Sequence, residues 1–153
     1  MRALLFVHVA ISLVGIAAGL VVAYGLITAQ RLEGWTRLFL VTTIATSVTG
    51  YPLPADRILP SHIVGAISLV ALAIAWMALY SRSLDGGWRA TYVITAVLSL
   101  YLNVFVGIVQ AFQKVPALKA LAPTQSEPPF VIAQAAALAL FVVGAWIGVR
   151  KFR

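Results

Sequence analysis

The sequence predicts an all-α fold, a polytopic membrane helical bundle of five transmembrane helices that forms one domain over residues 1–153. Three observations support this prediction. Hydrophobic residues make up 62% of the chain and charged residues only 10%, whereas a soluble domain carries about 25% charged residues. The charged residues leave five uncharged intervals, each of a length that can cross a bilayer. Prolines and glycines gather at the ends of these intervals.

The uncharged intervals set the predicted spans. A membrane-crossing helix needs roughly 20 apolar residues, within a range of about 17–25. The uncharged intervals cover residues 3–30, 38–55, 58–81, 90–113 and 128–149. Together with the signals at their ends, they predict helices at about 3–30, 35–51, 59–81, 90–113 and 130–149.

Residues that end or begin helices separate the predicted spans. Two prolines, Pro52 and Pro54, end the second helix because proline cannot continue it. Pro60 suits the first turn of the third, where its missing N–H costs nothing. In the longest loop, residues 115–121 are compatible with a short interfacial helix. A cleaved signal peptide has an apolar region of about 7–15 residues, so the longer segment 3–30 is interpreted as a retained span.

The distribution of basic residues predicts the orientation. If all five segments cross, one side holds Arg2, Arg57, Lys114 and Lys119. The other side holds Arg31, Arg37, Arg82, Arg89, Arg150, Lys151 and Arg153. Cytoplasmic loops are the richer in lysine and arginine, so the N-terminus is expected outside and the C-terminus in the cytoplasm of a bacterial inner (plasma) membrane. A re-entrant second segment is the alternative, and it leaves almost no charge bias.

Composition also restricts partners and chemistry. The net charge is +7, but the basic residues form no patch, so we expect the lipid bilayer as partner and no nucleic acid. The absence of cysteine excludes disulfides and thiolate metal sites. No nucleophile–base–acid set is visible, so the sequence indicates no enzyme activity. Two GxxxG patterns, at residues 15–19 and 144–148, predict close helix packing and allow a homo-oligomer.

The two histidines are the candidate cofactor-binding residues. His8 lies about two turns into the first helix and His62 about one turn into the third, both from the outer side. Two inward imidazoles at one depth suit a b-type haem held by axial histidines. They also suit a metal ion completed by Glu127 or Asp56. The alternative is that each histidine only hydrogen-bonds a neighbouring helix or loop, and the cofactor stays unassigned.

Polar residues of the fourth helix form the second candidate site. Asn103 and Gln110 belong to a stripe with spacings of three and four residues, which places them on one helix face. Tyr51 and Gln134 are expected to join them toward the outer half, as ligand-binding residues in a polar cavity for a small ligand, a quinone head or a solute. The alternative is interhelical hydrogen bonding that holds the bundle together, at about 0.6 kcal/mol per contact.

The C-terminal third contains NVF at 103–105, KVPAL at 114–118 and APTQSEPPF at 122–130. This pattern resembles an uncharacterised family of small multi-span inner-membrane proteins of proteobacteria. The resemblance implies an inner-membrane helical bundle and carries no activity, cofactor or site. The sequence therefore favours a membrane protein that binds a cofactor or small ligand (haem, quinone or metal) in an outer-side polar site. The alternatives are a small-solute transporter or channel, and an accessory subunit without chemistry.

Overall fold

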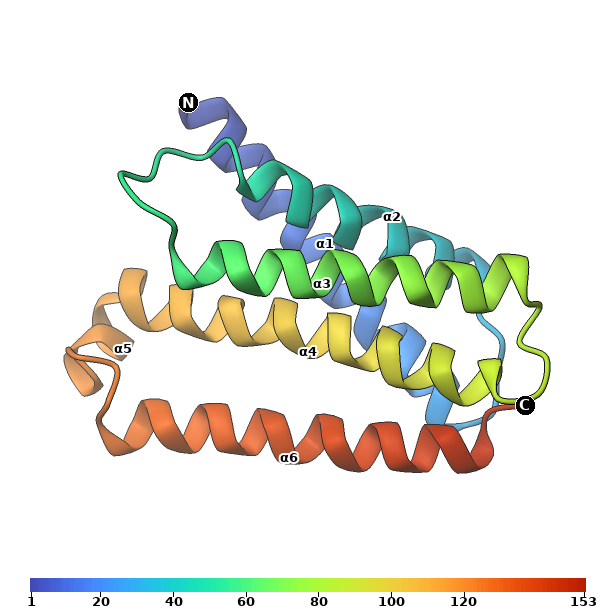
Figure 1. Ribbon diagram of the computed structural model, residues 1–153. Coiled ribbons are helices and arrows are strands. Elements are labelled where there is room, and N and C mark those ends of the chain that lie inside the picture. Colours follow the sequence, from blue (N-terminus) through green and yellow to red (C-terminus); the bar gives the residue numbers. More distant parts are fainter.

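The computed structural model describes residues 1–153 and contains helices but no strand. Five long helices lie side by side and alternate in direction (Figure 1). They are α1 (Arg2–Ile27), α2 (Glu33–Gly50), α3 (Pro60–Trp76), α4 (Trp88–Lys114) and α6 (Pro128–Lys151). A π-helical turn, η1 (Met77–Ser81), extends α3, and the short α5 (Pro116–Leu121) joins α4 to α6. The predicted all-helical bundle is confirmed.

The helices begin and end close to the predicted residues. The largest difference is at the C-terminus of α1, which stops at Ile27 instead of residue 30. There the Thr28 hydroxyl donates to the Tyr24 carbonyl and Ala29 takes a positive φ of 59°. At the start of α3, Pro60 occupies the first turn, as expected from its fixed φ. The region 115–121 forms α5, also with a proline at its start.

α4 is the central helix of the bundle. It contacts α1, α2, α3 and α6, whereas α1 contacts α2, α4 and α6. Consistent with this position, α4 carries the largest set of buried residues, from Tyr92 to Phe112. α6 lies at the periphery, and only Ala137 and Gly148 are buried on it. The N-terminal end of the bundle, as named here, holds the start of α1, the loop 51–59 and α5. The C-terminal end holds the loops 28–32 and 82–87 and residue 153.

The outer surface of the bundle is apolar. Large hydrophobic side chains are exposed on every long helix, among them Phe6 at 76% and Leu140 at 73%. Water would not tolerate such a continuous apolar surface, and lipid does. Four helices, α1, α3 with η1, α4 and α6, are long and apolar enough to cross a membrane. α2 is not among them, because Glu33, Arg37 and its threonines reduce its apolar character. These features are those of a membrane protein with a helical-bundle fold.

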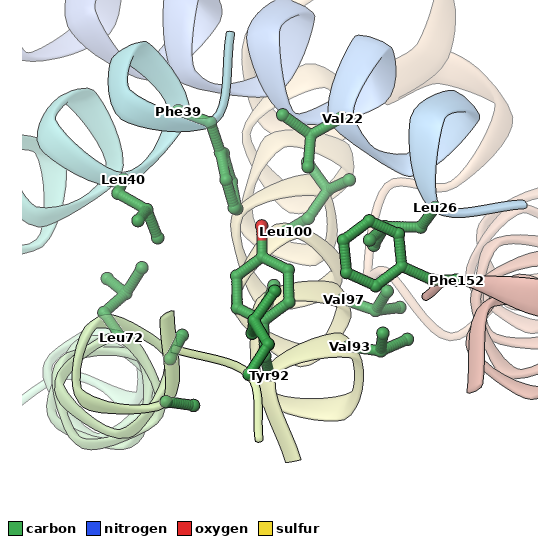
Figure 2. Close-up of a cluster of buried hydrophobic side chains, with 14 of the residues drawn as sticks. Val22, Leu26, Phe39, Leu40, Leu72, Tyr92, Val93, Val97, Leu100 and Phe152 are labelled. Atoms are coloured by element: carbon green, nitrogen blue, oxygen red, sulfur yellow. The ribbon is translucent and has the colours of Figure 1, made fainter. Parts of the chain in front are cut away.

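The apolar core lies between α1, α2, α3 and α4. Figure 2 shows Phe39 from α2 and Val22 from α1 near Leu100 of α4, and Leu40 from α2 pointing toward Leu72 of α3. Gly19 makes the close approach of α1 to α2 and α4 possible. A Cβ atom at Gly19 would lie 2.9 Å from the Phe39 ring and closer still to Leu100. A side chain at position 19 would therefore push α1 away from both neighbours.

The two GxxxG patterns are used differently. Gly15 and Gly19 face α2 and α4 of the same chain, so this face is already occupied within the bundle. In the second pattern Gly148 packs against Val93: a Cβ atom at Gly148 would lie 2.9 Å from Val93 Cγ1. Nothing lies within 4 Å of a Cβ atom at Gly144. The predicted homo-oligomer through these patterns stays a prediction.

Gly19→Ala is expected to destabilise the bundle by roughly 1–3 kcal/mol, the usual cost of overpacking a filled core. Gly144→Ala is the matched control, because its methyl group meets no neighbour and alanine is the better helix former. Unfolding of both variants in one detergent, followed by circular dichroism, measures the difference. Equal stability of the two variants would show that α1 does not approach α2 and α4 at Gly19.

Candidate functional site

His8 contacts the last turn of α2. Its Nδ1 atom lies 3.0 Å from the Thr49 hydroxyl oxygen. That hydroxyl donates its own proton to the Ala45 carbonyl at 2.7 Å, so His8 Nδ1 must carry a proton and donate it to Thr49. In the neutral ring the Nε2 lone pair is then free. His8 therefore keeps one nitrogen that can accept a hydrogen bond or ligate a metal.

His62 is engaged on both of its sides. Its Nδ1 atom accepts the backbone N–H of Leu59 at 2.9 Å and so caps the start of α3. The Tyr51 hydroxyl donates to the His62 carbonyl at 2.9 Å, and the two rings stack with centroids 5.6 Å apart. Because Nδ1 accepts, the neutral ring carries its proton on Nε2. Neither nitrogen of His62 offers a free lone pair to a metal in this arrangement.

The two histidines thus contact residues close together in the chain, Thr49 in the last turn of α2 and Tyr51 just after it, but they differ in what they can bind. A haem held by two imidazoles needs a free nitrogen from each, and this geometry supplies one, at His8. The bis-histidine haem stays a prediction that would require His62 to release Leu59. The structure brings Tyr51 and His62 together by hydrogen bonding and stacking. This agrees with the alternative in which each histidine only bonds a neighbouring helix or loop.

The carboxylates expected to complete a metal site do not join the histidines. No three His, Asp or Glu side chains lie close enough to hold a metal ion together. Glu127 stands just before α6 and holds the preceding turn instead: its carboxylate accepts the Thr124 hydroxyl at 2.8 Å and the Ser126 N–H at 3.1 Å. Desolvation acts to raise the pKa of this carboxyl, but these hydrogen bonds and that from the Thr124 N–H outweigh it and lower the pKa. Asp56 lies exposed in the loop 51–59.

The lowered pKa of Glu127 predicts that the turn at residues 124–127 is sensitive to acid. Since the folded pKa lies below the ordinary value of 4.5, the ionised carboxylate contributes its stabilisation in full above that value. The contribution is lost as the pH falls through the lowered pKa. The protection of the Thr124 and Ser126 amides against hydrogen exchange, taken relative to the intrinsic rate at each pH, should therefore fall as the medium is acidified, and should fall further than in Glu127→Gln. Identical pH profiles for the two proteins would show that the carboxylate does not hold this turn.

The other predicted ligand-binding residues lie at separate places. Asn103 is buried near the middle of α4, and its Oδ1 accepts the Ser12 hydroxyl of α1 at 3.0 Å. Gln134 of α6 donates to the Phe105 carbonyl at 3.2 Å. Gln110 is half-buried on α4 and makes neither of these contacts. Asn103 and Gln134 therefore each tie two helices together, and an outer cavity shared by Tyr51, Asn103, Gln110 and Gln134 stays a prediction.

A cleft lies at the C-terminal end, opposite to the predicted site. It has a volume of ≈ 300 Å³ and opens among the ends of α1, α3 and the starts of α2 and α4. Its apolar lining comes from Val22, Leu26, Leu79, Leu84 and Phe152. Ligand cavities in proteins begin at about this size.

Charged and hydroxyl-bearing groups surround this apolar lining. Arg31, Glu33 and Arg37 come from the α1–α2 connection and the first turn of α2, while Thr36 and Tyr92 contribute hydroxyl groups. The Arg31 Nε donates to the Arg153 backbone oxygen at 3.2 Å, which holds Arg31 in place beside Phe152. Arg37 is exposed at the rim. The cleft combines an apolar interior with a rim of positive net charge.

The backbone around the cleft is irregular. The π-helical turn η1 supplies Leu79 to its wall, and π-helical turns occur frequently at functional sites. Ser83 and Leu84 adopt positive φ angles of 49° and 59°, which residues with side chains rarely take. Such conformations cost of order 1–3 kcal/mol each and cluster at ligand sites. Ser83 and Leu84, which line the cleft, are therefore held in an unfavourable backbone conformation by their surroundings.

A layer of apolar side chains separates the cleft from the polar residues of the N-terminal end. Phe39, Leu40, Leu72 and Leu100 are between 0% and 2% exposed. The polar contacts of Ser12 with Asn103, and of His8 with Thr49, lie toward the N-terminal end of α1 from Gly19. The bundle is closed between its two ends at this layer.

Sequence reasoning missed the cleft because its residues come from five separate segments. A detectable signal was present: Arg31, Glu33 and Arg37 follow one another beside the first span. Comparison with protein-family models, curated proteins and solved structures finds no match to this chain. The resemblance to the proteobacterial inner-membrane family stays a prediction.

Proposed function

We propose that the protein is an integral membrane protein with five transmembrane helices, including α2. With 18 residues α2 is roughly 27 Å long, at 1.5 Å per residue, close to the hydrocarbon thickness of a bilayer. Its outer face carries apolar residues such as Val41 and Val48, each about half exposed. Figure 1 shows α2 running beside α1 in the opposite direction. This arrangement supports a membrane-crossing helix in preference to a re-entrant segment.

The threonines of α2 are compatible with a crossing. Within hydrocarbon every polar group needs an internal partner. The hydroxyls of Thr42, Thr46 and Thr49 donate to the carbonyls four residues earlier, at 2.7, 2.9 and 2.7 Å. These bonds offset most of the free-energy cost of placing the threonine hydroxyls of α2 in hydrocarbon.

In our proposal the C-terminal end faces the cytoplasm of a bacterial inner membrane and the N-terminal end faces outside. With alternating helices, the C-terminal end holds seven lysines and arginines and the N-terminal end four, as counted above. A reporter enzyme that is active only in the cytoplasm should therefore be active when fused after Arg153. Activity of a periplasm-specific reporter at the same position would contradict this orientation.

We further propose that the function is the binding of a small acidic amphiphile, a lipid-like molecule with a phosphate or carboxylate head, in the C-terminal-end cleft. The observation that carries this proposal is the combination of apolar lining and arginine rim in one cavity of ≈ 300 Å³. The guanidinium group matches phosphate and carboxylate in shape and charge. Leu26, Leu84 and Phe152 offer the complementary surface for the apolar part.

The position of the cleft supports the same class of ligand. Arg31 and Arg37 lie at the ends of membrane-crossing helices, at the level where lipid headgroups are found. An amphiphile in the bilayer can enter such a site with its head at the interface and its tail along the apolar lining. A haem or metal at the N-terminal end, as expected from the sequence, has one free imidazole to support it, at His8. A transporter would have to open the layer at Phe39 and Leu100.

Removal of the Arg37 charge should weaken the proposed binding. Native mass spectrometry of the detergent-purified protein, titrated with phosphatidylglycerol or phosphatidylcholine, measures both affinities. We expect preferential binding of phosphatidylglycerol and about a tenfold loss in Arg37→Gln, the value of one charged hydrogen bond. Lys151→Gln is the matched control, because it removes one charge at the same end outside the cleft.

Two results would contradict this proposal. Equal affinity for the two lipids would show that the protein does not recognise the acidic headgroup. An equal loss in Arg37→Gln and Lys151→Gln would show that general surface charge, and not the cleft, attracts the lipid.

A further inference from the structure

Two hydroxyl groups line the cleft inside its charged rim. Thr36 of α2 is 7% exposed and Tyr92 of α4 is 2% exposed, whereas Arg31 and Arg37 are exposed. Thr36 lies about one turn into α2 and Tyr92 about one turn into α4, both counted from the C-terminal end of the bundle. In Figure 2 the Tyr92 hydroxyl is the only oxygen drawn among the apolar side chains of the core. The two hydroxyls therefore form a polar spot between the arginines and the apolar lining.

The hydrogen bonds of this pair leave one proton unused. The hydroxyls of Thr42, Thr46 and Thr49 donate to carbonyls of their own helix. The Thr36 hydroxyl does not, and it lies within hydrogen-bonding reach of Tyr92. Two facing hydroxyls carry two protons, and a hydrogen bond between them uses one. The pair therefore retains one O–H donor, at the wall of the cleft.

The position of this donor selects a feature of the ligand. A donor that is nearly shielded from water is stabilised by an acceptor oxygen. In a glycerophospholipid the first polar group on the tail side of the phosphate is the ester carbonyl of an acyl chain. An ether-linked lipid of the same head has no carbonyl there. Beyond the hydroxyls the lining offers only apolar contact, from Val22, Leu26 and Leu79.

We propose that the Thr36–Tyr92 hydroxyl pair donates a hydrogen bond to an ester carbonyl of the bound amphiphile. The cleft then takes acyl-ester glycerophospholipids in preference to their ether-linked counterparts. This inference rests on the proposed binding of an acidic amphiphile in the cleft. The order of groups supports it: arginines at the rim, hydroxyls one turn further in and apolar side chains beyond follow the order of phosphate, ester and acyl chain in such a lipid.

Two phosphatidylglycerols with the same chains, one diester and one diether, test the proposal. Native mass spectrometry of the detergent-purified protein measures both affinities. We expect the wild-type protein to bind the diester about fivefold more tightly, the value of one neutral hydrogen bond. The preference should be lost in the double variant Thr36→Val with Tyr92→Phe, which removes both hydroxyls and keeps the side chains close to their original size.

Thr91→Val with Tyr24→Phe is the matched control, because it removes the same two groups at the same end of the bundle outside the cleft. This control should keep the preference, and the helical circular-dichroism signal reports whether each variant is folded. A preference that survives in the folded Thr36→Val, Tyr92→Phe protein would place the carbonyl elsewhere and overturn the proposal.

The wild-type comparison does not depend on the folding of any variant. Equal affinity of the wild-type protein for the diester and the diether would overturn the inference. If phosphatidylglycerol still bound more tightly than phosphatidylcholine, the proposed function would stand without it. Equal affinity for phosphatidylglycerol and phosphatidylcholine would contradict the proposed function, and this inference with it.

Discussion

The close approach of α1 to α2 and α4 at Gly15 and Gly19 positions the rest of the bundle. At Gly19 the facing side chains are apolar, so the approach builds the sealed layer of Phe39 and Leu100. At Gly15, one turn away, they are polar, and Thr43 and Asn103 meet at the helix backbone. Van der Waals packing drives helix association in lipid, where the hydrophobic effect is small. The same small residues therefore set the helix spacing and decide where polar groups can be buried.

The sequence predicted the class and the helix positions well, because the charged residues mark the helix ends and lipid requires helices. It also placed His8 and His62 at the same end. The protonation pattern of the two rings could not be predicted, because it depends on whether Thr49 donates to its own helix and on whether His62 turns back to Leu59. The cleft was not predicted because its lining comes from five separate segments, and one of them contains Leu84 at a positive φ that its residue type does not signal.

The polar groups of this protein fall into three levels along the bundle. The N-terminal end holds hydrogen-bonded pairs, such as His8 with Thr49, that fix the helix ends. The middle holds Asn103 and Thr43 behind the sealed layer. The C-terminal end holds the cleft, where Arg37 and Tyr92 border an apolar lining. His8 with Thr49 and Ser12 with Asn103 each tie two helices together, whereas the cleft opens at the C-terminal end.

The account depends most directly on α2 crossing the membrane, because the proposed orientation, and with it the cleft on the cytoplasmic side, needs its two ends on opposite sides. The chain has no cysteine, so Gly34→Cys and Asp56→Cys each introduce a single thiol, at the start of α2 and in the loop after it. A membrane-impermeant maleimide applied to intact spheroplasts should label Asp56→Cys at once and Gly34→Cys only after the membrane is opened. Labelling of both positions from the same side would show that α2 does not cross.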